Sequence, residues 1–425
     1  RRLPRLADLG FGAGRRHRVR EAPLIGAERI EARLQDRSEA NAQFFEAEAE
    51  RLAKLCHKMA ERFARDGRLV AFGSSPADRS DARHVAVEFV HPVIVGKSAL
   101  PALGLAGEGG DIAPQVLLEA EAEDIAMAFG AEPDILAAIA AARERGCLTI
   151  AFTKDSGAEW EFDLSAIEDP LIRQEIAETL YHLLWELVHI FLDHRGLLEG
   201  SKAKPVHDSG ASSFLYPFLG QQEHDLDAIL DDVRKSMLMK AEEVTALRTQ
   251  TLTEGTDTLL AAAAVLRERL DAGGRLIALG NGGSATDAMD VVADFRTAMF
   301  GGPARRALDL TEDTGIITAV ANDIGTDAIF SRQVIAYGRP GDVLLALSTS
   351  GNSLSVLEAL REGRRRGLVT IAFVGYDGGN VAAGGEADHI VISRSQNIPR
   401  IQEAQASVYH VLRELVELAE PEPDR

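Results

Sequence analysis

The sequence predicts an α/β protein with two consecutive domains, each built on a parallel sheet that has helices on both faces. Apolar strands alternate with amphipathic helices along most of the chain, and this alternation is typical of parallel sheets. The same order occurs twice: GRLVAFGSS corresponds to GRLIALGNG, and RQEIAETLYH corresponds to IQEAQASVYH. A length of 425 residues also exceeds that of one ordinary domain and favours two.

The first domain is assigned to residues 25–197, and the Arg-rich residues 1–24 are expected to form a disordered tail outside the fold. Periodic apolar residues predict its helices, and short apolar runs predict its strands. In chain order these elements are a helix at 28–66, a strand at 68–75, a helix ending near 90, a strand at 124–130, a helix at 135–145, a strand at 147–153 and a helix at 171–193.

Residues 198–224 are rich in Gly, Ser and Pro and interrupt the periodic pattern, so they are assigned as a linker. The second domain, residues 225–425, repeats the order of the first. Its predicted elements are helices up to 270, a strand at 275–280 followed by a helix, a strand at 342–350, a helix at 355–366, a strand at 369–374 and a helix at 399–418.

Composition and charge exclude several classes of protein. A net charge of −20 repels nucleic acid and anionic membrane surfaces, so neither is expected as a partner. The chain has no apolar run of membrane-spanning length, and Cys56 and Cys147 lack metal-site spacing, which favours a cytoplasmic location. Neither a G-x-G-x-x-G nor a Walker A pattern is present, so no nucleotide cofactor is expected.

Two loops between a strand and a helix are candidate phosphate sites. Glycines allow close backbone approach, and hydroxyl or amide side chains at a helix start can hold an anion. The first loop alone is weak evidence, whereas the hydroxyl cluster of the second, LSTSGNS, is a strong signal. The candidate residues are Asn281, Gly282, Gly283 and Ser284 in the first loop, and Ser348, Thr349, Ser350 and Ser353 in the second.

The segments GNGGSATDAM, VANDIGTDAIFSRQV, GDVLLALSTSGNS and RIQEAQASVYH occur in one order that resembles the phosphoheptose isomerases of the sugar isomerase (SIS) family. The first half resembles the same fold more distantly, so the whole chain is identified as a tandem SIS protein. The resemblance implies three-layer α/β/α, flavodoxin-like domains. It also implies tetramers with active sites at subunit interfaces.

Functional residues carry over from the family only where the motif matches. In the second half the resemblance implies that the loop residues above contact phosphate or sugar, together with Asp313 and Gln402, and that His410 is catalytic and metal-binding. Where the family has a His and a Glu four residues apart, this half has Asp290 and Asp294. A metal set of Asp290, Asp294, Gln402 and His410 is therefore the weaker candidate.

The first half retains the reactive residues. His84 and Glu88 lie four residues apart on one predicted helix face, and Gln174 and His182 lie two turns apart on another. These four positions match the family pattern and suit either a zinc-type or other divalent metal site or a general acid/base pair. The alternative is that Glu88 and His182 are ordinary helix residues near solvent.

The phosphate loops of the first half are altered. The segment FGAEPDI replaces LSTSGNS, so Glu132 lies at a helix start where its carboxylate would repel a phosphate. One half therefore has the phosphate loops and the other the acid/base set. Since SIS sites lie at interfaces, we expect the halves to form a pseudo-dimer in which one lends reactive residues to the other, and two chains to pair into a pseudo-tetramer.

The expected activity is aldose–ketose isomerisation of a sugar phosphate through an enediol, as for sedoheptulose 7-phosphate in the family. Glu88 or Asp294 would remove the carbon-bound proton, and His182 or His410 would act as the acid. The alternative is a sugar-phosphate sensor or assembly protein without turnover.

Overall fold

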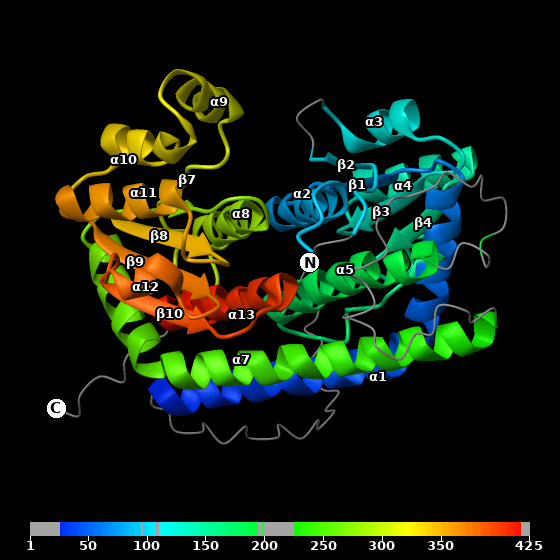
Figure 1. Ribbon diagram of the computed structural model, residues 1–425, viewed down its shortest axis with the longest axis horizontal. Coiled ribbons are helices and arrows are strands. Elements are labelled where there is room, and N and C mark those ends of the chain that lie inside the picture. Colours follow the sequence, from blue (N-terminus) through cyan, green and yellow to red (C-terminus); the bar gives the residue numbers. More distant parts are fainter. Residues whose placement is uncertain (1–25, 95–96, 107–109, 194–197, 199–224, 418–425) are drawn as a thin grey trace, which may run out of the picture.

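The computed structural model describes residues 26–94, 97–106, 110–193, 198 and 225–417. Two five-stranded sheets lie next to one another, and every strand pair in them is parallel. Helices cover both faces of each sheet (Figure 1), which confirms the predicted tandem three-layer architecture. The expected tail and most of the expected linker lie outside the described residues.

The first half contains a sheet with strand order β2-β1-β3-β4-β5. Its elements are α1 (Gly26–Ala64), β1 (Leu69–Gly73), α2 (Pro76–Val90), β2 (Ala102–Leu105), α3 (Ile112–Glu119), β3 (Ile125–Phe129), α4 (Pro133–Arg145), β4 (Leu148–Ala151), β5 (Trp160–Glu161) and α5 (Pro170–Asp193).

The second half contains a sheet with strand order β10-β9-β8-β6-β7. Its elements are α7 (Leu226–Asp271), β6 (Leu276–Leu279), α8 (Gly283–Arg296), β7 (Ala307–Asp309), α9 (Thr314–Asp323), the 3-10 helix η2 (Thr326–Ala328), α10 (Ser331–Tyr337), β8 (Val343–Ser348), α11 (Leu354–Arg365), β9 (Val369–Gly375), α12 (Gly379–Ala383), β10 (His389–Ser393) and α13 (Ile398–Glu417).

The central strands are apolar throughout because both of their faces are covered. Along β1, Leu69 and Ala71 belong to the core under α1 and α5, whereas Val70 and Phe72 belong to the core under α3 and α4. The edge strands β2, β5, β7 and β10 were not anticipated. They have two to five residues and are mostly only partly buried, so each gives a weaker sequence pattern than a central strand.

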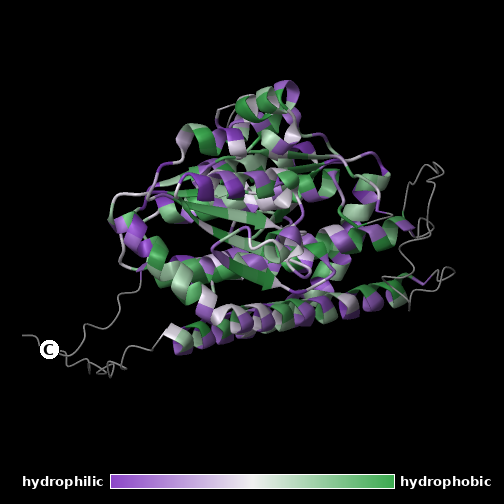
Figure 2. Ribbon diagram, turned by 60° about the vertical axis from the view of Figure 1, so that its left-hand side comes forward, coloured by the Kyte–Doolittle hydropathy of each residue, from purple (hydrophilic) through white to green (hydrophobic). Residues whose placement is uncertain are grey.

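The long helices α1 and α7 run antiparallel beneath both sheets (Figure 1). Their pairing is fixed along its length, since Asn41 donates a hydrogen bond to the carbonyl of Ala241 at 3.0 Å, while Gly26 lies against Leu260. Hydrophilic and hydrophobic residues alternate along the long helices (Figure 2), and apolar residues such as Leu52 of α1 and Leu259 of α7 are buried. Each helix is thereby shared between the two halves.

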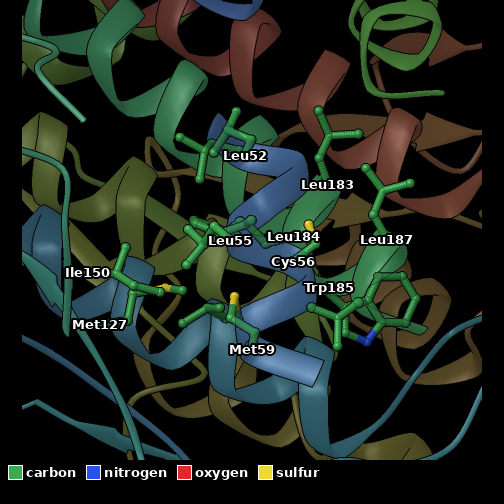
Figure 3. Packing of buried hydrophobic residues seen from close by; sticks show 14 of the residues in the cluster. Leu52, Leu55, Cys56, Met59, Met127, Ile150, Leu183, Leu184, Trp185 and Leu187 are labelled. Atoms are coloured by element: carbon green, nitrogen blue, oxygen red, sulfur yellow. The ribbon is translucent and has the colours of Figure 1, made fainter. Parts of the chain in front are cut away.

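The hydrophobic cores confirm this exchange. The largest core combines α1, α5 and the sheet of the first half around Leu55 and Trp185 (Figure 3), and it also takes in Met237 from the start of α7. Conversely, Ile30 at the start of α1 is buried in the core of the second half beside Leu259. The two halves are therefore interlocked rather than simply adjacent. No described helix is both long and apolar enough to cross a membrane.

The interlocked cores predict that a substitution in α1 destabilises the second half. Ile30 is 3% exposed, so Ile30→Ala should lower the free energy of unfolding by about 2–4 kcal/mol. Hydrogen exchange should become faster at the amides of α7 around Leu259, while β1 and β3 keep their protection. Faster exchange confined to the first half would contradict the shared core.

Candidate active site

The two halves meet through four helices that carry the expected reactive residues. Helices α2 and α8 contact one another at the centre of the molecule, and α5 contacts α13 (Figure 1). Ser75 caps α2 by accepting a hydrogen bond from the amide of Asp78, and Pro76 occupies the first turn. Gly282, whose φ is +59°, makes the sharp turn that leads into α8.

The first cluster joins two histidines, a glutamate and a glutamine. The Nε2 atoms of His84 and His182 lie 3.3 Å apart, and the Gln402 amide nitrogen lies 3.2 Å from His84 Nε2. Glu88 Oε1 lies 3.9 Å from the same nitrogen. All four side chains are at most 2% exposed, so the solvent-exposed helix face considered for Glu88 and His182 is wrong.

Neighbouring carboxyl groups orient both imidazoles. His182 Nδ1 is hydrogen-bonded to Glu403 Oε1 at 3.0 Å, and His84 Nδ1 lies 3.7 Å from Asp287 Oδ1. Burial, together with the positive charge of Arg400, lowers the pKa of His182 to about 3, and burial followed by repulsion from His182 lowers the pKa of His84 well below its usual value. Both rings are therefore neutral at physiological pH, with Nε2 directed at one common point.

A second cluster lies at the corresponding place in the second half. His410 Nδ1 is hydrogen-bonded to Glu175 Oε1 at 2.8 Å, and His410 Nε2 lies 3.5 Å from Asp294 Oδ2. Asp290 is hydrogen-bonded to Ser80 and lies near Gln174. The predicted group of Asp290, Asp294 and His410 is thus brought together.

The two clusters differ in protonation. Burial would lower the pKa of His410, but the hydrogen bond to Glu175 and the charge of Asp294 outweigh burial and raise it. Burial raises the pKa of Asp294 to about 6 despite the attraction of His410. The pKa of His410 is thus raised, whereas the first cluster presents neutral imidazole nitrogens, which are the ligands that divalent metals require.

Gln174 and Gln402 each lie with the cluster of the other half. Gln402, from α13 of the second half, contacts His84, whereas Gln174, from α5 of the first half, lies with Asp290. The sequence-based grouping of Gln174 with His84, and of Gln402 with Asp290, therefore differs from the structure. The difference arises because α5 and α13 pack against one another across the interface, so that each helix reaches both clusters.

Buried carboxyl groups occupy the space between the clusters. Asp287 has no hydrogen bond to either carboxylate oxygen, and Glu178 Oε1 also lacks one. Burial, then repulsion from Asp290, raises the pKa of Asp287 well above its usual value. The groups His84, Glu88, His182 and His84, Glu178, Asp287 could each hold a metal ion, because one ligand atom per residue lies within 4.8 Å of the others.

The first phosphate loop touches the first cluster. A Cβ atom at Gly283 would overlap the amide of Gln402 and lie 2.9 Å from His84 Nε2. Gly283 begins α8, so the amides at the start of that helix lie beside the two histidines. The His84 cluster and the candidate phosphate loop of the second half are consequently in direct contact.

The second phosphate loop is shaped by its own hydrogen bonds. Ser348 Oγ accepts a hydrogen bond from the amide of Gly351, whose φ is +62° and whose Cβ position is blocked by the carbonyl of Gly378. Asn281 donates to Ser355 Oγ at 3.0 Å, which joins the two loops. Thr349, Ser350 and Ser353 lie in the same turn at the start of α11.

Two adjoining pockets lie at this end of the second sheet. One, of about 760 Å³, is lined by Ser350, Tyr376 and Arg394, and the other, of about 730 Å³, extends to Val93 from the first half. Arg394 forms an ion pair with Glu254 at 3.3 Å and supplies a positive charge that the sequence analysis missed. Its position after an edge strand gave no signal.

Asp313 is the predicted residue that the described structure does not bring to the clusters. It is exposed and caps α9, where its carboxylate accepts a hydrogen bond from the amide of Ile316 at 2.9 Å. Ser284, by contrast, is buried in the first turn of α8.

Comparisons with known proteins agree with this architecture. The SIS domain family matches residues 241–375. The phosphoheptose isomerase of Chlorobaculum tepidum is 44% identical over 165 residues, which cover 38% of this chain and 78% of that protein. The phosphoheptose isomerase of Chlorobium phaeovibrioides is 40% identical over 190 residues, covering 44% and 86% of the two chains.

Two solved structures match almost the whole chain. The C-terminal domain of glucosamine-fructose-6-phosphate aminotransferase from Francisella tularensis has a TM-score of 0.58 at 10% identity and covers 91% of this chain and 94% of that chain. Tagatose-6-phosphate ketose/aldose isomerase from Escherichia coli has a TM-score of 0.52 at 12% identity and covers 93% and 95%. At these identities the likeness shows a shared fold.

Fold and sequence together define a protein with two SIS domains. More narrowly, through its second half the chain belongs to the family of phosphoheptose isomerases.

The carboxyl group of Asp287 predicts a pH-dependent effect on stability. Because folding raises its pKa, wild-type protein loses stability as pH rises from the unfolded-state value through the folded-state value. In metal-free protein, Asp287→Asn should remove this loss, so that the variant gains about 1–3 kcal/mol relative to wild type between pH 5 and pH 8. Urea unfolding at both pH values measures the difference, with the exposed Asp257→Asn as control. A difference that does not grow with pH would contradict the assignment.

Proposed function

We propose that the protein is a sugar-phosphate isomerase whose single composite site combines both halves. The observation that carries this proposal is the position of Gly283, where the candidate phosphate loop enters α8, against His84 and Gln402. The loops of the second half bind the phosphate, with helix-terminal amides and the hydroxyls of Ser348 and Ser350. His84, Glu88 and His182 of the first half act on the sugar.

The reaction is a pair of proton transfers. Glu88 Oε2, which has no hydrogen bond, takes a proton from the carbon next to the carbonyl group and returns it to the neighbouring carbon. The neutral imidazole of His182 donates a proton to the carbonyl oxygen and regains one from the adjacent hydroxyl group. Protons therefore balance over the cycle, and the enediol forms only between the two transfers. Asp294 and His410 belong to the other cluster and are not assigned this role.

The first cluster fits a divalent metal such as zinc as an alternative to the acid role of His182, because a ring nitrogen that binds a metal has no proton to donate. His84, His182, Glu88 and Gln402 supply two neutral nitrogens, a carboxylate and an amide, and Gln402 Oε1 and Glu88 Oε2 have no hydrogen-bond partner. Such an ion would polarise the carbonyl oxygen of the sugar. The second cluster fits less well because the raised pKa of His410 makes its proton harder to displace.

Sedoheptulose 7-phosphate is the proposed substrate. The support is the 40–44% identity to proteins named phosphoheptose isomerase, together with the match of the SIS domain family to residues 241–375, which include both candidate phosphate loops. The altered loop at Glu132 favours one working site per chain rather than two.

A sugar-phosphate sensor is the competing function. It is supported by the burial of Glu88, which raises the pKa of this carboxyl group to about 8. Glu88 is then mostly protonated at neutral pH, and cannot act as a base, unless a metal or substrate displaces the proton.

We also propose that two chains pair, and that the protein is located in the cytoplasm. Helices α3 and α9 occupy corresponding positions in the repeat and lie on the same side of the molecule (Figure 1). Leu118 is 82% exposed and Ile324 is 58% exposed, and no residue of α9 is buried. A second copy would cover both apolar helices and complete a pseudo-tetramer.

The assignment of the base predicts opposite results for two matched carboxylates. Glu88→Gln should lower kcat by about 10²–10⁴-fold with little change in KM, because phosphate binding lies elsewhere. Asp294→Asn, at the equivalent position of the repeat, should lower kcat by less than about tenfold. Deuterium incorporation from heavy water into sedoheptulose 7-phosphate, followed by NMR, measures proton transfer directly.

The reverse order of effects would place the base in the second cluster. Binding of sedoheptulose 7-phosphate by wild-type protein without deuterium incorporation would contradict catalysis and favour the sensor.

Metal affinity should depend on pH through Glu88. Burial, then the charges of Glu186 and Glu403, raises its pKa to about 8, and zinc must displace that proton. Between pH 6 and pH 8 zinc affinity should rise by up to about tenfold per pH unit, because the two histidines are already neutral. Competition with a chromophoric chelator measures it, and Glu88→Gln should flatten the profile. A flat profile in wild type would exclude Glu88 as a ligand.

A further inference from the structure

The first half contains a pocket of its own, of about 590 Å³. It lies at the carboxyl ends of β1, β3 and β4, which is where parallel α/β sheets bind ligands. Its wall is apolar on one side, at Phe129, Phe152 and Leu164, and its size suits a small organic molecule. Through the internal repeat it corresponds to the phosphate-binding end of the second half.

A carboxylate lines this pocket where the other half has its candidate phosphate loop, and a second one lies beside it: Asp78 belongs to the lining, and the exposed Glu132 lies next to the lining residue Gly130. A Cβ atom at Gly130 would overlap Glu132 Oε2 and lie 2.6 Å from Asp78 Oδ2, so the two carboxylates face the same point. Asp78 is hydrogen-bonded to Ser75, and Glu132 accepts a hydrogen bond from the amide of Ala131 at 3.1 Å. Burial, and after it the charge of Glu132, raises the pKa of Asp78. A phosphate at this point would meet negative charge.

The floor of the pocket holds a buried carboxylate. Asp294, from α8 of the second half, lines the pocket and is 7% exposed; its Oδ2 atom lies 3.5 Å from His410 Nε2 and accepts no hydrogen bond of normal geometry. Gln174 also lines the pocket beside Asp290, and its amide nitrogen makes no hydrogen bond of normal geometry. These groups provide an acceptor and a donor for hydroxyl groups of a ligand. The one lining arginine, Arg173, donates to the carbonyl of Ile167 at 2.9 Å.

We propose that this pocket binds a small polyhydroxylated amine without a phosphate group. Its ammonium group lies between Asp78 and Glu132. In the repeat, this position corresponds to the proposed phosphate position of the second half. Its hydroxyl groups reach Asp294 and Gln174, and its carbon skeleton packs on Phe129 and Phe152. The two halves of the chain thus select ligands of opposite charge from the same position of a repeated fold.

The proposal is tested by binding, not by turnover. Glucosamine is titrated into metal-free full-length protein by calorimetry at pH 6.5, and glucose, which has a hydroxyl in place of the ammonium group, is the matched control. We expect glucosamine to bind at least about fivefold more tightly than glucose. Equal affinity of the two sugars, or no binding of either, would overturn the proposal.

Variants locate the binding. Glu132 is exposed, so Glu132→Gln leaves the fold intact, and it should weaken glucosamine binding by about fivefold without changing the affinity for glucose. Asp294→Asn should weaken the binding of both sugars. Ser350→Ala, in the other pocket, should leave glucosamine binding unchanged. If Ser350→Ala weakens it and Glu132→Gln does not, glucosamine occupies the phosphate pocket and the proposal is wrong. The outcome is independent of isomerase activity, which these titrations do not measure.

Discussion

The structure depends on a layer of buried ion pairs where the two halves interlock. Arg37 of α1 reaches Glu175 of α5 at 2.9 Å and Glu414 of α13 at 3.1 Å, and Lys240 of α7 reaches Glu186 of α5 at 2.7 Å. Removing one partner of such a pair leaves an uncompensated buried charge, which costs about 3–5 kcal/mol. The long helices are therefore held in register by charge as well as by their apolar faces, and this register sets which residues of one half reach the other.

The same layer gives two equivalent histidines different protonation. Burial alone would raise the pKa of Glu175, but Arg37 and the hydrogen bond from His410 hold it well below its usual value. For its counterpart Glu403, burial prevails over Arg400 and raises the pKa to about 8. The carboxylate of Glu175 therefore raises the pKa of His410, whereas the pKa of His182 is lowered to about 3. Charged residues outside the two clusters thus shift the pKa values of two equivalent histidines in opposite directions.

Much of the fold and of the candidate site could be predicted from the sequence, because the patterns that indicate them are local. Strand and helix alternation, the repeat, the glycine and serine loops, and the i,i+4 spacing of His84 and Glu88 all depend on neighbouring residues. The exchange of Gln174 and Gln402 could not be predicted, since it follows from packing between helices more than 200 residues apart. Asp287 was missed because an aspartate in a helix carries no signal of burial, and Arg394 because it follows a short edge strand. Asp313 fits the family motif, yet it serves as a helix cap here.

Joining the two halves in one polypeptide has a genetic consequence. In a protein assembled from identical subunits, every substitution appears in all sites at once, so a mutation that improves one pocket for a new ligand damages its copies. Here Glu132 and Ser350 are encoded separately, although they lie in corresponding loops that lead into α4 and α11. The interlocked helices keep the halves together in fixed one-to-one proportion. Selection can therefore preserve chemistry in one site while the other drifts toward a different ligand.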